Sequence, residues 1–231
     1  MIEFRNAGVT VQQADGEPDR RILRPVTLTL GEPRISVIGA NGSGKSTLLK
    51  LINGLVLPTE GSVAVKGLST AREGSKVRRE VGFVFTDPLS QLVMPTGRED
   101  VELSLRSRIK NAAARREAGI EVLRRFGLAT LADQSIYDLS GGERQLLAIA
   151  VVSAVEPTVL VADEPTTLLD LRNETLIRAV FRQLGQQVVF ATHNLDFALE
   201  SDRTLVVDAA EVVFDGDPTE AVAYYRKLCA Q

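Results

Sequence analysis

Residues 39–47 have the sequence GANGSGKST, a glycine followed by four residues and then Gly-Lys-Ser. Three glycines let this backbone curl so that several N–H groups point into one concavity, which suits a chain of phosphates at the start of a helix. We expect Lys45 to reach the β- and γ-phosphates of a nucleotide and the hydroxyl of Ser46 to ligate Mg²⁺. The predicted nucleotide-binding residues of this loop are Gly39, Asn41, Gly42, Ser43, Gly44, Lys45, Ser46 and Thr47.

The segments on both sides of this loop support the prediction. Residues 34–38 (RISVI) form a short, mostly apolar run that predicts a buried strand. The leucines and isoleucine of residues 48–52 begin a predicted helix, which Gly54 can end. Strand, loop and helix follow in the order that a phosphate-binding loop requires. The alternative is an ordinary glycine turn between a strand and a helix.

Composition limits the class of protein. The chain has 231 residues, 44% of them hydrophobic, which is enough for one large α/β domain or a core with a subdomain. A net charge of −3 does not favour nucleic acid as the partner, and a single cysteine, Cys229, excludes an internal disulfide. The N-terminus lacks the pattern of a signal peptide, and apolar runs such as residues 146–155 are shorter than the roughly 20 residues of a membrane span. We expect a chain that is soluble in itself.

Strand and helix patterns alternate along the chain, which favours a mostly parallel sheet covered by helices. A small antiparallel layer is expected at the start, with a polar hairpin loop at residues 12–20. Charged, helical residues predict a subdomain at about 87–139, inserted into a core of about 1–86 and 140–231. Strands are expected near residues 2–11, 26–30, 63–65, 81–85, 158–162, 188–192, 204–207 and 212–214, and helices near 99–105, 112–126, 141–155, 176–184 and from 219.

One of these helices is recognised by an apolar stripe at helical spacing. We expect Gly185 to be the C′ residue of this helix, because glycine adopts the left-handed conformation that ends many helices. The stripe consists of Leu176, Ile177, Val180, Phe181 and Leu184.

Polar side chains follow two predicted core strands. Asp163 and Glu164 end the apolar run at residues 158–162, and His193 follows the run at 188–192. Ligands of open α/β sheets gather at the carboxyl ends of strands. We expect Asp163 to hold Mg²⁺, Glu164 to polarise the water that attacks the γ-phosphate, and His193 to donate a hydrogen bond to that phosphate. The alternative is two solvated acids and an ordinary surface or core histidine.

Residues 139–145 (LSGGERQ) complete the pattern. Ser140 can cap the helix that follows, and two glycines leave backbone N–H groups open to an anion. With residues 39–47 and Asp163-Glu164, this segment resembles the LSGGQ-type signature of ABC-transporter ATPases. The order of motifs resembles that family over essentially the whole chain, and residues 167–170 (TLLD) correspond to its D-loop.

The resemblance implies a P-loop NTPase fold and ATP hydrolysis in a head-to-tail dimer, most simply a homodimer. ATP would lie between the phosphate loop of one subunit and Ser140, Gly141 and Gly142 of the other, with Asp170 also facing the nucleotide. One chain holds one copy of each half, so two complete sites need two chains.

Two positions depart from the family pattern. Thr86 stands where the family has a Mg²⁺-coordinating glutamine, and Gln91 is five residues further on. Val11 stands near the position of the aromatic side chain that stacks on adenine, and no aromatic residue lies between Phe4 and Phe83. We expect the nucleotide to be held more by phosphate contacts than by its base, with apolar contact from Val11.

Three segments, residues 83–105, 166–173 and 212–218, resemble ATPases of energy-coupling-factor importers, the last two those of biotin importers in particular. That resemblance implies a place on the cytoplasmic face of the cell membrane, a transmembrane coupling protein and a substrate-binding membrane protein as partners, and biotin as the solute. A cobalt or nickel importer is the alternative. The candidate contacts to the coupling protein are Leu89, Leu92, Val93 and Met94, whose alternative role is ordinary packing.

Three other functions compete with this prediction. A soluble ABC ATPase of DNA repair or translation usually has two cassettes or long insertions, which are absent from this sequence. A small-molecule kinase would leave LSGGERQ without a role. A nucleotide sensor that does not hydrolyse its nucleotide would leave Glu164 without a role.

Overall fold

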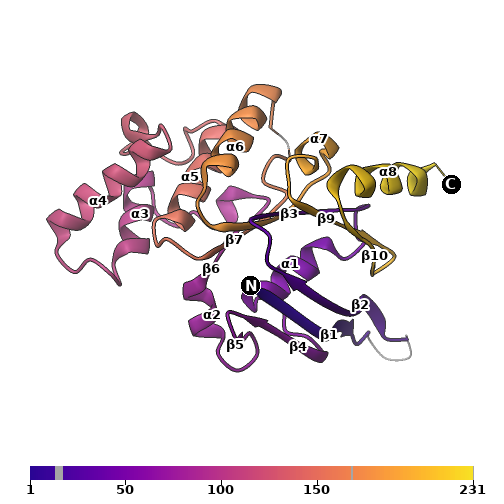
Figure 1. Ribbon diagram of the computed structural model, residues 1–231. Coiled ribbons are helices and arrows are strands. Elements are labelled where there is room, and N and C mark those ends of the chain that lie inside the picture. Colours follow the sequence, from indigo (N-terminus) through magenta and orange to yellow (C-terminus); the bar gives the residue numbers. More distant parts are fainter. Residues whose placement is uncertain (14–17, 168, 231) are drawn as a thin grey trace.

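The computed structural model describes residues 1–13, 18–167 and 169–230, arranged around two sheets (Figure 1). The larger sheet has six strands in the order β10-β9-β3-β8-β7-β6. All neighbouring pairs in it are parallel except β9 with β10, which form a terminal hairpin. The strands are β3 (Arg34–Ile38), β6 (Val81–Val84), β7 (Val159–Asp163), β8 (Gln187–Ala191), β9 (Arg203–Asp208) and β10 (Glu211–Gly216). The expected mostly parallel sheet is confirmed.

The smaller sheet is antiparallel, with the order β2-β1-β4-β5, and it confirms the expected N-terminal layer. Its strands are β1 (Ile2–Val11), β2 (Arg20–Leu30), β4 (Glu60–Val65) and β5 (Leu68–Ser69). Helix α1 (Lys45–Asn53) contacts strands of both sheets, and its buried leucines join one core cluster with the inner faces of both. The phosphate loop therefore lies where the two sheets are held together.

Helices cover the other face of the large sheet (Figure 1). A second core cluster joins α3, α4, α5 and α6 to strands β6, β7 and β8. The helices after α1 are α2 (Gly74–Glu80), α3 (Gly97–Leu105), α4 (Ala112–Arg125), α5 (Gly141–Ser153), α6 (Leu171–Gln183), α7 (Leu195–Ala198) and α8 (Pro218–Cys229), with short 3₁₀ turns at Pro88–Ser90 and Ala129–Leu131. None of the described helices is long and apolar enough to cross a membrane.

Two details of the expected α6 are wrong. Leu184 after α6 is extended (φ −63°, ψ 130°), and Gly185 is not among the residues with positive φ, so the chain leaves the helix without a left-handed glycine. Of the expected apolar stripe, only Ile177 and Phe181 are fully buried. Leu176 is 46% exposed. By contrast, Gly54 does end α1 in the left-handed conformation (φ 72°) and donates its N–H to Lys50 O.

Parts of two sequence predictions lie outside the described residues. Residues 14–17 belong to the expected hairpin loop between β1 and β2, and Leu168 belongs to the TLLD segment. The strands on either side, β1 and β2, pair antiparallel with Val11 opposite Arg20.

Candidate functional site

The phosphate loop connects β3 to α1 and depends on its glycines. Gly39, Gly42 and Gly44 have φ values of 152°, 75° and 114°, a region that residues with a Cβ rarely adopt. A Cβ at Gly39 would lie 2.0 Å from Val207 O, so no larger residue fits there without a shift of β9. The first helical hydrogen bond runs from Leu48 N to Gly44 O (2.9 Å), which leaves the N–H groups of the first turn of α1 free for an anion.

Lys45 is folded into this loop. Its side chain is only 4% exposed, and its ammonium group donates to Gly39 O (2.9 Å) and Ala40 O (3.0 Å). Glu164 Oε1 lies 3.7 Å from the same nitrogen. Burial lowers the pKa of Lys45, and the charges of Glu164 and Asp163 oppose that shift. The lysine therefore joins the loop to the two acids.

Ser46 and Asp163 meet at the carboxyl end of β7. The Ser46 hydroxyl donates to Asp163 Oδ1 (2.9 Å), and Asp163 is 5% exposed. Burial raises the pKa of this carboxyl, although the hydrogen bond from Ser46 and the charge of Lys50 oppose the shift. A hydroxyl and a carboxylate are ligands that suit Mg²⁺. Ser43 Oγ, in the same loop, is buried with no hydrogen-bond partner among the described residues, which fits a site that binds a further polar group.

The raised pKa of Asp163 predicts that its ionised carboxylate lowers the free energy of unfolding at neutral pH. The folded state binds this proton more tightly than the unfolded chain, so the contribution to stability is greatest below the unfolded pKa and is lost as pH rises through the raised one. We expect Asp163→Asn to raise the Tm of the nucleotide-free protein at pH 7 by about 2–4 °C, equivalent to ~1 kcal/mol in a domain of this size. Thermal unfolding across pH tests this: the gain should vanish at acidic pH, and a lower Tm at pH 7 would contradict it.

Glu164 and His193 face each other from the ends of β7 and β8. His193 Nε2 lies 2.7 Å from Glu164 Oε1, and Thr167 Oγ1 donates to Glu164 Oε2 (3.0 Å). Glu164 has a φ of 52°, a left-handed conformation that is unusual for a residue with a side chain. Such strain is retained where the surroundings impose it, often at functional sites. The structure therefore brings together Lys45, Ser46, Asp163, Glu164 and His193, as the sequence predicted.

The LSGGERQ segment begins α5. Ser140 Oγ accepts from Glu143 N (3.3 Å), and Glu143 Oε2 accepts from Ser140 N (2.7 Å), so the two residues form a capping box. The next two N–H groups, of Gly141 and Gly142, lie at the first turn of the helix, where the backbone provides no acceptor. The described residues show no hydrogen bond or ion pair between this segment and residues 39–47 of the same chain. Asp170 caps α6 by accepting from Asn173 N (2.8 Å).

The two unusual positions have structural roles. Thr86 Oγ1 donates to Asp163 O (2.9 Å), so Thr86 supports the turn that carries both acids, a role that its sequence context did not reveal. Gln91 accepts from Phe85 N (2.9 Å) and donates to Ala148 O (3.1 Å), which joins the end of β6 to α5. Val11, at the end of β1, is 50% exposed and so is available for apolar contact.

Strand, glycine loop, lysine and acidic strand end together define a phosphate-loop nucleoside triphosphatase. The profile of the family described as ABC transporter matches residues 23–167. A Deinococcus radiodurans protein provisionally assigned as an ABC transporter ATP-binding protein is 46% identical over 98% of both chains. The biotin transport ATP-binding protein BioM of Rhizobium etli is 40% identical over 99% of both. This chain belongs to the ABC transporter family and is one of its ATP-binding, ATP-hydrolysing subunits.

The fold agrees with solved members of this family. An ATP-binding cassette solved as a dimer in a post-hydrolysis state with ADP and Pi superposes with a TM-score of 0.84 at 31% identity, covering 94% of this chain and 99% of that one. The protein cbiO1 of Clostridium perfringens, part of the ABC transporter complex cbiONQ, superposes with a TM-score of 0.82 at 28% identity. The match covers 100% of this chain and 94% of cbiO1. The resemblance found in the sequence is confirmed.

Proposed function

We propose that this chain is the ATPase subunit of an energy-coupling-factor importer and that the solute is biotin. The observation that carries this proposal is the match to the Rhizobium etli BioM protein over nearly the full length of both chains. A BioM protein of Rhodobacter capsulatus is 36% identical over 205 residues. An energy-coupling-factor ATP-binding protein, EcfA1 of Halalkalibacterium halodurans, is 39% identical over 211 residues.

The geometry supports a division of roles within the site. Residues 39–47 cradle the phosphates, and Lys45 carries the charge that meets them. Ser46 and Asp163 would hold Mg²⁺, which would neutralise developing charge on the phosphates. Glu164 accepts the proton of the attacking water, and His193 donates to the γ-phosphate.

The second half of the site comes from another copy of this chain. The free N–H groups of Gly141 and Gly142, with Ser140, form a positive helix end that suits the γ-phosphate of the partner's nucleotide. Closure of this dimer on ATP and its reopening after hydrolysis would drive a transmembrane coupling protein. The helical subdomain, about residues 87–139, lies between β6 and α5 and would transmit the movement.

The solute is tested by co-purification with the membrane partners. Tagged protein is isolated in detergent with its transmembrane partners, and retention of radiolabelled biotin is compared with that of Co²⁺ and Ni²⁺. We expect biotin alone to be retained at stoichiometric levels. Retention of either metal ion instead would favour a metal-ion importer, and failure to recover any membrane protein would favour a soluble ABC ATPase.

The loop after β6 presents the contact to the coupling protein. Asp100 accepts from Val93 N and Met94 N (3.2 Å each), which holds the loop, and Val93 is 69% exposed. Leu92 is only 5% exposed and packs in the core of the helical face, so its role is ordinary packing. Met94 is partly exposed and stays a candidate, and the two more exposed candidates are Leu89 and Val93.

We expect the double variant Leu89→Asp/Val93→Asp to reduce recovery of the membrane partners at least 10-fold, because two charges would be placed in an apolar contact. Its Tm and its ATPase activity without partners should stay close to those of the wild type, since neither side chain is in the core. The control is Leu103→Asp, an exposed leucine on α3. Full recovery with the double variant would place the contact elsewhere.

A further inference from the structure

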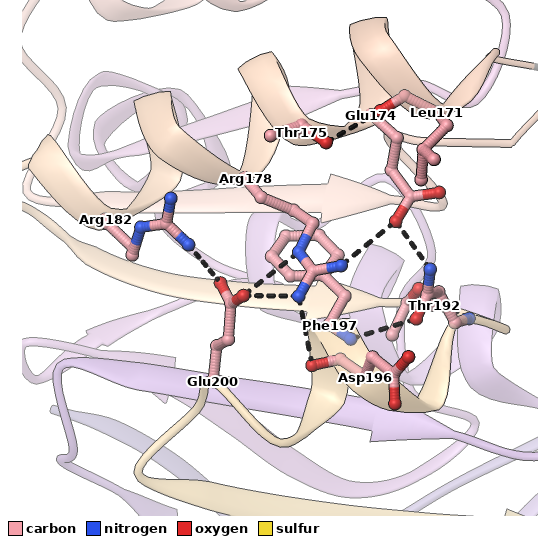
Figure 2. A network of polar contacts seen from close by, with 10 residues as sticks. Leu171, Glu174, Thr175, Arg178, Arg182, Thr192, Asp196, Phe197 and Glu200 are labelled. Atoms are coloured by element: carbon pink, nitrogen blue, oxygen red, sulfur yellow. Dashed lines mark hydrogen bonds and ion pairs between the residues drawn. The ribbon is translucent and has the colours of Figure 1, made fainter.

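A polar network joins α6 to the segment that carries His193 (Figure 2). Glu174, in the first turn of α6, accepts a hydrogen bond from Asn194 Nδ2 (2.5 Å). Asn194 immediately follows His193, which in turn lies 2.7 Å from Glu164. A residue outside the nucleotide site is thus connected to His193 through one neighbouring side chain.

Glu174 is itself held in place. Arg178, one turn further along α6, donates from Nη1 to Glu174 Oε1 (3.2 Å) and from Nε to Glu200 Oε1 (3.0 Å). The guanidinium carbon of Arg178 lies 5.7 Å from the centre of the Phe197 ring, a cation–π contact. Phe197 stacks on Phe190 of β8 at 4.3 Å. The carboxylate of Glu174 therefore has a fixed position relative to the strand that ends next to His193.

Asn194 is held by hydrogen bonds of its backbone and of both ends of its side-chain amide. Its N–H donates to Thr192 Oγ1 (3.0 Å), and its Oδ1 accepts from Phe197 N (3.0 Å) as the cap of α7. Its amide nitrogen donates to Glu174. His193 is partly exposed, so the backbone around it is held by these neighbours rather than by burial of the ring.

We propose that Glu174 is a positioning residue for His193, acting through the amide of Asn194. The proposal rests on the role of His193 at the γ-phosphate. The neighbouring Asn173 packs closely against Gly142 of the LSGGERQ segment. A Cβ added at Gly142 would lie only 2.2 Å from Asn173 Cγ. The first turn of α6 thus contacts both the His193 segment and the segment that faces the partner's nucleotide, and it links the two half-sites of one chain.

The test reverses donor and acceptor at this contact. Asn194→Asp keeps the shape and the cap of α7 but places two carboxylates against each other. We expect its kcat for Mg-ATP to fall about 10-fold with KM changed less than 2-fold, because a displaced His193 affects the reacting phosphate more than binding. The double variant Asn194→Asp/Glu174→Gln restores one hydrogen bond with the roles exchanged, and its kcat should return to within about 2-fold of wild type.

A His193→Ala background separates positioning from a structural role. If Asn194→Asp acts through His193, it should lower kcat no further in that background, whereas a general structural defect would lower it again. Arg182→Ala is the control, since Arg182 pairs only with Glu200 among the described residues and its kcat should not change. A wild-type kcat in Asn194→Asp, or no rescue by the double variant, would overturn the proposal. Absence of turnover in the wild type would count against the ATPase function instead.

Discussion

The Glu164→Gln variant should lose ATP hydrolysis by about 100- to 10,000-fold while its affinity for ATP stays within a few-fold of wild type. Removal of a general base costs this much in typical enzymes. The change is isosteric, so the amide oxygen can still accept from Thr167 at the position where Glu164 Oε2 accepts now. What is lost is the ability to take a proton from water, and phosphate release under saturating Mg-ATP measures it.

The same variant tests the dimer. With hydrolysis blocked, ATP stays bound, and we expect the protein to elute as a dimer in Mg-ATP and as a monomer without nucleotide. The matched control is Glu80→Gln, a partly exposed glutamate remote from the site that pairs with Lys66, whose turnover should stay at the wild-type level. A Glu164→Gln protein that remains monomeric at saturating Mg-ATP would contradict the shared site.

The phosphate loop was predictable because its signals are local. The mostly apolar residues 34–38, the glycine spacing and the helix start at Lys45 all lie between positions 34 and 45, and each has its own preferred conformation. The strand ends that bring Asp163 and His193 near this loop were also predictable, since parallel strands place their carboxyl ends at one edge.

Contacts between distant segments were not predictable from local patterns. The bond from Thr86 to Asp163 O and the bond from Asn194 to Glu174 depend on how strands and helices pack, and no spacing along the chain signals them. The left-handed backbone of Glu164 (φ 52°) likewise has no signal in the neighbouring sequence. The role of Leu92 also stayed open in the sequence, because an apolar residue in a loop can belong to the core or to a contact surface, and only its burial decides between the two.

The Lys45→Ala variant should weaken ATP binding about 10- to 100-fold, which is the usual cost of losing charge-assisted hydrogen bonds. The Lys45 ammonium nitrogen lies 3.7 Å from Glu164 Oε1, and its removal leaves that carboxylate and Asp163 facing the incoming phosphates without this positive charge. Equilibrium binding of a fluorescent ATP analogue measures the loss. Lys76→Ala is the control, because Lys76 is an exposed lysine of α2 that pairs with Glu73, and its removal should change affinity less than 3-fold.

Lys45 can favour ATP binding in two ways: it can attract the phosphates directly, and it can offset the repulsion between the phosphates and Glu164. If part of the loss in Lys45→Ala comes from uncompensated repulsion by Glu164, the double variant Lys45→Ala/Glu164→Gln should bind ATP more tightly than Lys45→Ala alone, although it cannot hydrolyse it. If the loss comes only from missing bonds to phosphate, the two should bind equally. Recovery in the double variant would show that Lys45 neutralises the site for the nucleotide as well as contacting it, while equal affinities would contradict that role.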